Sequence, residues 1–187
     1  SPFGLRNKLV SLIENEIKNA KAGKKAWIRI KINNLTDEEI ITKLYKAGAA
    51  GVQVRLIVRG MFSMTPGASG VSENIKAIGI VDRFLEHSRF MIFCNDGNEL
   101  VYITSADMMP RNLDRRIEVT CPIWDPAIKK EISDVFNIQW SDNVKARVLD
   151  AELSNGIVTN GESPLRSQTE IHRYYSEISF PAGQPAQ

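Results

Sequence analysis

Residues 26–58 read AWIRIKINNLTDEEIITKLYKAGAAGVQVRLIV. Apolar and polar residues alternate over residues 26–32, which predicts a strand, and the apolar run VQVRLIV at the end of the stretch predicts another. Between them, Thr36 and Glu39 fit a capping box, so we expect a helix that starts there and ends near Gly48. A strand, a helix and a second strand in so short a span indicate a βαβ unit with parallel strands, and therefore an α/β fold.

Elements on both sides of this unit follow from periodicity and turn residues. Apolar residues recur at helical spacing between Phe3 and Ala22, which predicts an amphipathic helix ended by Gly23. Two strands at about 89–94 and 99–104 flank the sequence NDGN, which is typical of a hairpin turn.

Three further elements rest on caps and short apolar runs. The loop at residues 59–70 leads to Ser72, which we expect to cap a short helix. Another strand is predicted at residues 115–123. The segment 125–140 is predicted as a helix, with Asp125 as its N-cap and a proline in the first turn.

The chain is predicted to form a single domain over residues 1–187, with its core at about 1–142. Residues 143–187 are expected to be a tail of helix and loop. Within this tail, VKARVLDAEL at residues 144–153 is interpreted as one more helix, and NGIVTNGESP as a loop. The last eight residues, 180–187, are expected to be frayed.

The composition excludes several classes of protein. The chain has 187 residues, 43% of them hydrophobic and 25% charged, which fits an ordinary globular domain. Its net charge is only +2, with 24 basic and 22 acidic residues, so we expect no general nucleic-acid-coating surface. Cys94 and Cys121 lie far apart and no histidine is spaced for zinc, so we expect free thiols and no metal site. Without a signal-like or membrane-spanning segment, we expect a soluble cytosolic protein or fragment.

The segment 82–116 holds one of the two histidines and a dense set of side chains of the types that suit phosphate binding. His87 is followed two residues later by Arg89, which lies on the same face if the backbone is extended. An imidazole beside a fixed cation suits a phosphoryl oxygen, either as a proton donor or as a hydrogen-bond donor. A lone histidine before a strand is more often structural, so the function depends on the residues around it.

Arg59 follows the predicted strand at residues 52–58 and therefore lies at a carboxyl end, beside a glycine-rich loop. An arginine there can donate two parallel hydrogen bonds to phosphate. The sequence PGASGVSEN, residues 66–74, offers backbone NH groups at a helix start, although it lacks the ending of a Walker loop. The alternative is a solvated turn in which Arg59 pairs with a nearby carboxylate.

A third group of polar residues begins where the strand VYIT ends, in TSADMMPRNLDRR. Its candidate site residues are expected to open on the same side as the other strand ends. The interleaved acidic and basic residues favour an internal ion-pair network around a site, with one or two arginines reaching the ligand. The residues in question are Ser105, Asp107, Arg111, Asn112, Asp114, Arg115 and Arg116. His172 lacks comparable neighbours, and we assign it no role.

Several long blocks of the chain resemble the C-terminal domain of bacterial polyphosphate kinase. They include KINNLTDEEIITKLYKAGAAGVQVRLIVRG, PGASGVSENI, AIGIVDRFLEHSR, SADMMPRNLDRRIEV and DNVKARVLDAELSN, in that order over nearly the whole chain. The resemblance implies a phospholipase D-like fold, an α/β/α sandwich with a mixed sheet and a single repeat. The HxK signature of that superfamily is present as His87, Ser88 and Arg89, with arginine in place of lysine.

The resemblance also implies a function. In this family a histidine of a preceding domain takes the γ-phosphoryl group of ATP and passes it reversibly to polyphosphate, and this chain has no counterpart of that histidine. Arg59 and His87 match the residues of the family that contact ATP. The implied partners are ATP or ADP with Mg²⁺, polyphosphate, the preceding domains and further copies of the enzyme. Cytoplasmic location is implied, with peripheral membrane association also compatible. Alone, the chain is expected to be inactive.

Two other functions remain open from the sequence. The first is a phospholipase D-like phosphodiesterase or nuclease, in which two HxK chains form a dimer with one site. Arg89 in place of lysine and the near-neutral charge argue against it. The second is a non-catalytic module that binds nucleotide or polyphosphate.

Overall fold

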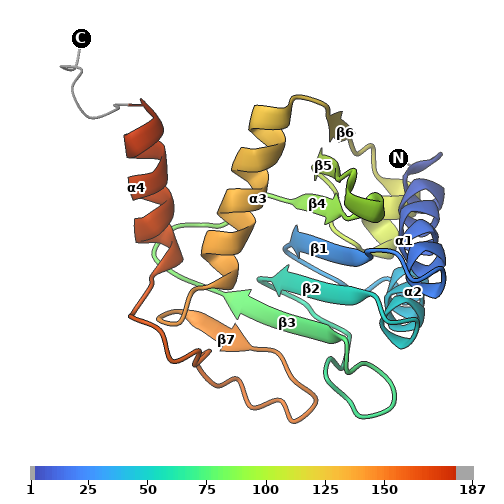
Figure 1. Cartoon of the computed structure of the whole chain (residues 1–187), viewed down its shortest axis with the longest axis horizontal. Coiled ribbons are helices and arrows are strands. Elements are labelled where there is room, and N and C mark those ends of the chain that lie inside the picture. Colours follow the sequence, from blue (N-terminus) through green and yellow to red (C-terminus); the bar gives the residue numbers. More distant parts are fainter. Residues whose placement is uncertain (1–2, 180–187) are drawn as a thin grey trace.

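The computed structural model of the chain describes residues 3–179 and forms three layers around one mixed sheet (Figure 1). The sheet has seven strands in the order β6-β5-β4-β1-β2-β3-β7. Its strands are β1 (Trp27–Ile32), β2 (Gln53–Val58), β3 (Ile75–Ile80), β4 (Phe90–Phe93), β5 (Leu100–Thr104), β6 (Thr120–Ile123) and β7 (Ala146–Val148). The helices are α1 (Leu5–Lys21), α2 (Glu38–Ala49), α3 (Pro126–Trp140) and α4 (Ser167–Ser179), and short turns of 3-10 and π-helix lie at Asn95–Gly97 and Arg111–Arg115.

The central βαβ unit is confirmed. β1 and β2 pair in parallel, and α2 connects them. The cap of α2 differs from the prediction: its N-cap is Asp37, one residue after Thr36, and the Asp37 side chain accepts a hydrogen bond from the Ile40 amide. The predicted capping box is therefore wrong. Asp37 is preferred because its buried carboxylate also accepts two hydrogen bonds from Arg6 of α1.

The segment after β2 contains a strand instead of the expected helix. Ser72 is buried in a series of turns, where its hydroxyl accepts from the Ala68 amide and donates to the Thr65 carbonyl. No helix begins there, so the predicted anion-binding helix start at residues 66–74 is absent. The chain instead enters β3, which pairs in parallel with β2.

The prediction of a helix at residues 144–153 is also wrong. Residues Ala146–Val148 form β7, which pairs antiparallel with β3 at the edge of the sheet. Ala146 is fully buried between exposed Lys145 and Arg147, which is the alternation of a strand. The sheet therefore continues beyond residue 142.

The hairpin of β4 and β5 is confirmed. Its turn places Asn95, Asp96 and Gly97 at positive φ, which asparagine, aspartate and glycine tolerate better than other residues. β6 is shorter than predicted, because the chain from Arg111 to Arg115 forms a helical turn and pairing with β5 begins only at Thr120.

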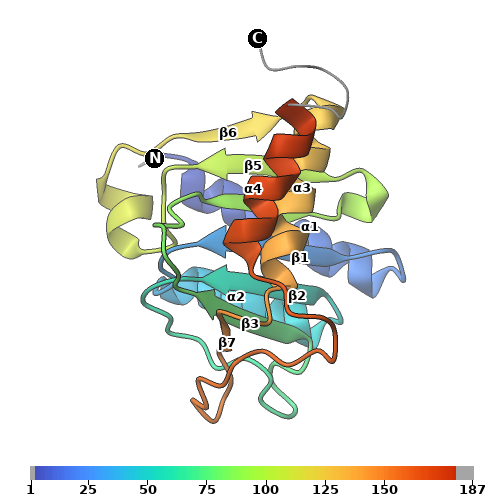
Figure 2. The ribbon, with the colours of Figure 1, turned by 90° about the vertical axis from the view of Figure 1, so that its left-hand side faces the viewer.

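The two faces of the sheet are covered by different helices. α1 and α2 cover one face and enclose the larger core, whereas α3 covers the other face (Figure 1). α4 packs on the outer side of α3, as Figure 2 shows, and has no counterpart among the predicted elements. The expected frayed end at residues 180–187 lies outside the described residues. Cys94 and Cys121 are free thiols, as predicted. Among the described residues, no helix is both long and apolar enough to span a membrane.

We predict that Asp37→Ala lowers the free energy of unfolding by about 2 kcal/mol, because it removes both a helix cap and a largely buried partner of Arg6. Thr36→Ala is the matched control, and its cost should stay below about 0.5 kcal/mol. Chemical denaturation of the three proteins measures both values. Equal costs for the two variants would show that Thr36 contributes to the cap after all.

Candidate functional site

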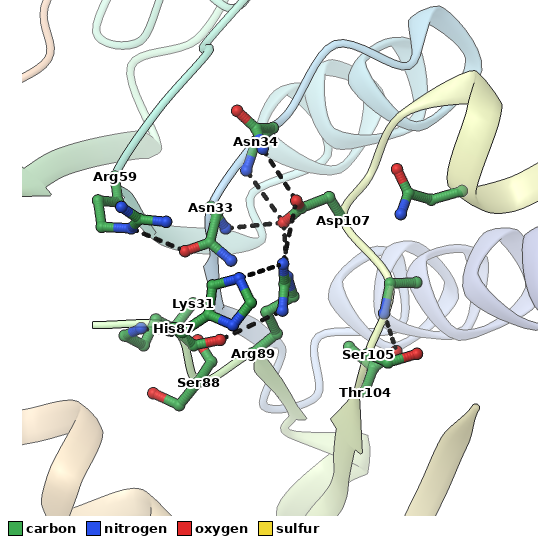
Figure 3. Close-up of polar contacts among 12 residues, drawn as sticks. Lys31, Asn33, Asn34, Arg59, His87, Ser88, Arg89, Thr104, Ser105 and Asp107 are labelled. Atoms are coloured by element: carbon green, nitrogen blue, oxygen red, sulfur yellow. Dashed lines mark hydrogen bonds and ion pairs between the residues drawn. The ribbon is translucent and has the colours of Figure 1, made fainter. Parts of the chain in front are cut away.

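The candidate site lies where four adjacent strands of the sheet have their ends, namely the C-terminal ends of β1, β2 and β5 and the N-terminal end of β4 (Figure 3). Asn33 follows the last residue of β1, and Arg59 follows the last residue of β2. Arg89 directly precedes β4, which runs antiparallel to β1, and Asp107 lies in the loop after β5. Residues distant in sequence meet here because β4 runs antiparallel to β1, so β4 begins on the side of the sheet where the parallel strands β1 and β2 end.

The carboxylate of Asp107 is the centre of this site. It is buried and accepts hydrogen bonds from the backbone amides of Asn33 (2.9 Å) and Asn34 (3.1 Å) and from the Asn34 side-chain amide (2.9 Å). Arg89 donates to both carboxylate oxygens, at 2.9 and 3.4 Å. Burial alone raises the pKa of Asp107, but these hydrogen bonds outweigh it and lower the pKa below its ordinary value.

Arg89 connects Asp107 to His87. Its guanidinium lies 3.1 Å from Nε2 of His87 and donates to the His87 carbonyl at 3.2 Å. Because a guanidinium has no acceptor, the contact with Nε2 is a hydrogen bond only when that nitrogen carries no proton. The arrangement therefore selects the His87 tautomer with its proton on Nδ1.

Arg59 lies on the other side of the β1 end. Its Nε donates to Oδ1 of Asn33 at 2.9 Å, and the side-chain NH2 group of Asn33 is buried with no hydrogen-bond partner among residues 3–179. In the same part of the chain Arg59 forms no ion pair, so the alternative of a turn in which Arg59 pairs with a carboxylate is not observed. The Asn33 amide that accepts from Arg59 is neutral, so the charge of the guanidinium is not compensated there and Arg59 is able to bind an anion.

Lys31 is a buried cation that the sequence analysis did not single out. Its ammonium donates to the carbonyls of Ser88 (2.7 Å) and Glu86 (3.1 Å), on both sides of His87. Its pKa is lowered to about 8, mainly by burial and also by the nearby charges of Arg59 and Arg89, against the opposing effects of Glu86 and Asp107. The alternating pattern of β1 predicted a strand, but not that this lysine points toward the site.

Gly60 allows the turns after β1 and β2 to touch. A Cβ at this position would lie 2.7 Å from Oδ1 of Asn34 and 3.0 Å from the Asn33 carbonyl. Asn34 Oδ1 also accepts a hydrogen bond from the Met61 amide at 2.9 Å. Asn33 and Asn34 therefore link Arg59, Asp107 and the β2 turn, although their only sequence signal was two asparagines directly after a strand.

The remaining predicted residues lie elsewhere in the loop that follows β5. Ser105 donates to Glu118 and accepts from the Val119 amide, and Asn112 donates to Glu118 at 2.6 Å. The expected ion-pair network within residues 104–116 is wrong, because Asp107 pairs with Arg89 and Asp114 pairs with Arg6. The three arginines of that loop are exposed, namely Arg111, Arg115 and Arg116. His172 is exposed on α4.

A cavity of about 460 Å³ opens beside Arg59, between the ends of β2 and β3 and the chain around β7. Its charged lining residues are all cationic: Arg59, Lys145 and Arg147. The loop before β7 is held in place by Asp142, whose buried carboxylate accepts the amide of Lys145 at 2.7 Å. Within residues 3–179 no group of three histidine, cysteine or acidic side chains is arranged to hold a metal ion.

Comparison with known protein families identifies a match over most of the chain. The family model described as polyphosphate kinase C-terminal domain 2 matches residues 1–168. A polyphosphate kinase of Vibrio parahaemolyticus is 53% identical over 179 residues, which are 95% of this chain and 26% of that relative. The polyphosphate kinase of Escherichia coli K12 is 46% identical over 182 residues, which are 97% of this chain and 26% of that relative. The chain thus spans about a quarter of the length of these curated relatives.

Solved structures agree with this match. The crystal structure of polyphosphate kinase from Porphyromonas gingivalis superposes with a TM-score of 0.92 at 43% identity, over 95% of this chain and 28% of that chain. Nuc of Salmonella typhimurium, a phospholipase D family member, gives a TM-score of 0.51 at 16% identity, over 72% of this chain and 88% of that chain. The second likeness concerns the fold alone, and it confirms the expected phospholipase D-like architecture.

We predict that Asp107→Asn lowers the free energy of unfolding by about 3 kcal/mol at neutral pH, because it leaves a largely buried arginine without its anion. Since the folded-state pKa of Asp107 is lowered, this difference is complete above about pH 4 and shrinks as the pH falls through the lowered pKa. Denaturant titrations at several pH values measure it. Asp96→Asn, at an exposed ion pair, is the control and should cost less than about 0.5 kcal/mol.

Proposed function

The chain belongs to the polyphosphate kinase family, in which it corresponds to the C-terminal domain, and we propose from this premise that it supplies the ATP-phosphate site of an ATP:polyphosphate phosphotransferase. The observation that carries the proposal is that two residues lie at the same strand ends: an arginine that pairs with no carboxylate of residues 3–179, and a histidine oriented by a second arginine. Positive charge and directed donors are what a transferring phosphoryl group requires.

The reaction is expected to proceed through a histidine in the part of the enzyme outside this chain. A nitrogen of that histidine attacks the γ-phosphorus of ATP, the bond from phosphorus to the ADP oxygen breaks, and ADP leaves. A terminal oxygen of polyphosphate then attacks the same phosphorus, and the N–P bond breaks. In each step, negative charge is spread over the equatorial oxygens of the transferring phosphoryl group. The cations and hydrogen-bond donors of this chain are proposed to stabilise that charge.

Arg59 is proposed to hold the nucleotide phosphates. Its Nε is already occupied by Asn33, which fixes the plane of the guanidinium, and the two terminal nitrogens remain to donate to phosphate oxygens. His87 is proposed to donate from Nδ1 to the transferring group, since Arg89 occupies its Nε2. Arg89 is itself paired with Asp107, so we assign it the orientation of His87 and not direct substrate binding.

The cavity beside Arg59 extends this phosphate site. Lys145 directly precedes β7 and Arg147 lies within it, and both line the cavity. The chain as a whole is nearly neutral, so three cations around one cavity form a local positive region. We propose that this cationic groove, lined by Arg59, Lys145 and Arg147, receives the polyphosphate chain.

Mg²⁺ is proposed to enter as part of the ATP complex. The described residues contain no cluster of potential metal ligands, so they fit a metal held by the nucleotide phosphates better than one held by a carboxylate cage. Bound there, Mg²⁺ neutralises part of the phosphate charge.

The rest of the polypeptide is proposed to cover the site. Val81, Phe84 and Leu85, which lie within the six residues before His87, are between 64% and 71% exposed. Large apolar side chains at this exposure are typical of a surface that another domain covers. The relatives are almost four times as long as this chain. We propose that residues of the longer polypeptide outside this chain, in the same molecule or in a further copy, form the covering region.

In a polyphosphate kinase that carries this chain, we predict that His87→Ala lowers the rate of polyphosphate synthesis from ATP by about a hundredfold or more, because a positioned donor is lost. Arg59→Ala should lower kcat/KM for ATP by a similar factor. Labelled ATP and Mg²⁺ provide the assay. His172→Ala changes the other histidine, which is exposed on α4, and should retain full activity. Full synthesis by both site variants would contradict the proposal.

For the cationic groove we predict that Lys145→Gln raises KM for polyphosphate about tenfold in the reverse reaction while kcat changes little. The reason is that the Lys145 charge is proposed to attract the polyphosphate equally in the ground state and in the transition state, so its removal weakens binding alone. Lys25→Gln removes the same charge from an exposed site outside the groove and should have no effect. Steady-state kinetics with varied polyphosphate and, separately, varied nucleotide measure the change. An increase limited to the nucleotide KM would place the nucleotide in the groove instead.

A further inference from the structure

Residues 81–88, here called the His87 segment, connect β3 to β4 without any regular secondary structure. His87 near its end is exposed, and the only backbone hydrogen bond within the segment joins the His87 amide to the Leu85 carbonyl. A segment of this kind has many accessible conformations, so contacts from outside it must hold the imidazole in place.

The first turn of α4 provides the most extensive of these contacts. The side chain of Gln168 accepts from the Phe84 amide at 3.0 Å and donates to the Phe84 carbonyl at 2.8 Å, so it pairs with the backbone as a neighbouring strand would. The same NH2 group donates to Oε1 of Glu86 at 3.1 Å. One glutamine therefore binds the His87 segment at two residues.

The other oxygen of Glu86 is held from α3. Gln139, which is 1% exposed, donates to Oε2 of Glu86 at 3.0 Å. From β1, the Lys31 ammonium donates to the carbonyls of Glu86 and Ser88. His87 is thus flanked by residues whose side chain or backbone is bound from β1, α3 and α4.

Two further contacts keep α4 at this position. Arg166, just before α4, donates to both oxygens of Asp82 at 2.8 and 2.5 Å, and the Asp82 side chain is only 2% exposed. Along the helix, Tyr174 donates to Asp134 of α3 at 2.9 Å. α4 therefore docks on the His87 segment at one end and on α3 along its length.

We infer that Gln168 is a positioning residue for His87, and that the polypeptide beyond residue 142 completes the site by holding the His87 segment. The inference rests on the proposed function, because it concerns the same histidine. Gln168 acts through Phe84 and Glu86 and is not expected to touch the substrate. Small displacements of a group that acts on the transition state reduce the rate of the chemical step more than they reduce binding.

The test uses the polyphosphate kinase that carries this chain, with activity expressed per folded molecule from circular dichroism. Gln168→Met keeps the length of the side chain but removes its three hydrogen bonds, and we expect kcat to fall about tenfold with KM for ATP nearly unchanged. Thr169→Ala changes an exposed neighbour on the same helix and should behave as wild type.

A charge exchange tests the contact between Gln168 and Glu86 directly. Gln168→Glu places a second carboxylate beside that of Glu86, so it should lower kcat further than Gln168→Met does. Combining it with Glu86→Gln restores one donor and one acceptor and should recover part of the lost kcat. The bond to the Phe84 carbonyl is lost in both the single and the double variant, so a purely structural role of α4 predicts the same kcat per folded molecule for the two.

The inference is overturned if kcat of Gln168→Met stays within twofold of wild type, if the loss only follows the loss of folded protein, or if the double variant is no better than Gln168→Glu. His87→Ala is measured beside these variants. An inactive His87→Ala with an unaffected Gln168→Met rejects the positioning role alone. A fully active His87→Ala rejects the proposed function, and the positioning role with it.

Discussion

The buried carboxylate of Asp107 is the constraint on which the rest of the site depends. It accepts hydrogen bonds from the turn after β1 and from the arginine that precedes β4, so one side chain joins the two central strands of the mixed sheet to the loop after β5. A carboxylate so far from water is stable only with this full set of donors. Fixing it therefore fixes Asn33, Asn34 and Arg89, and through them Arg59 and His87.

The electrostatics of the site follow from this arrangement. Arg89 is neutralised by Asp107, whereas the side chain of Arg59 donates to the amide of Asn33 and pairs with no carboxylate of residues 3–179, and Lys31 is a buried cation with a lowered pKa. Of these three cations, only Arg89 forms an ion pair with a carboxylate of residues 3–179. The positive charge is therefore local, and a phosphate site of this kind is compatible with a chain whose net charge is only +2.

The elements that were predicted wrongly from the sequence, β3, β7 and two helix caps, all depend on tertiary contacts. β3 was missed because an apolar run of six residues is compatible with either helix or strand, and its strand form depends on the exposed edge of β2. β7 has only three residues and is a strand because it pairs with β3. Ser72 and Thr36 are both acceptable helix caps, but tertiary partners made Ser72 part of a turn and gave the cap of α2 to Asp37.

The sequence by itself determined the βαβ unit, the β4–β5 hairpin, α1, α3 and the family, because these depend on local periodicity, turn residues and long blocks of similar sequence. It also identified Arg59, His87, Arg89 and Asp107 as neighbours at strand ends. Only the tertiary structure decided that Asp107 pairs with Arg89, that Asn33 binds Arg59 and that α4 holds the His87 segment. The reason is physical: these contacts join residues up to 84 positions apart, and local preferences carry no information about which strand ends and helices meet.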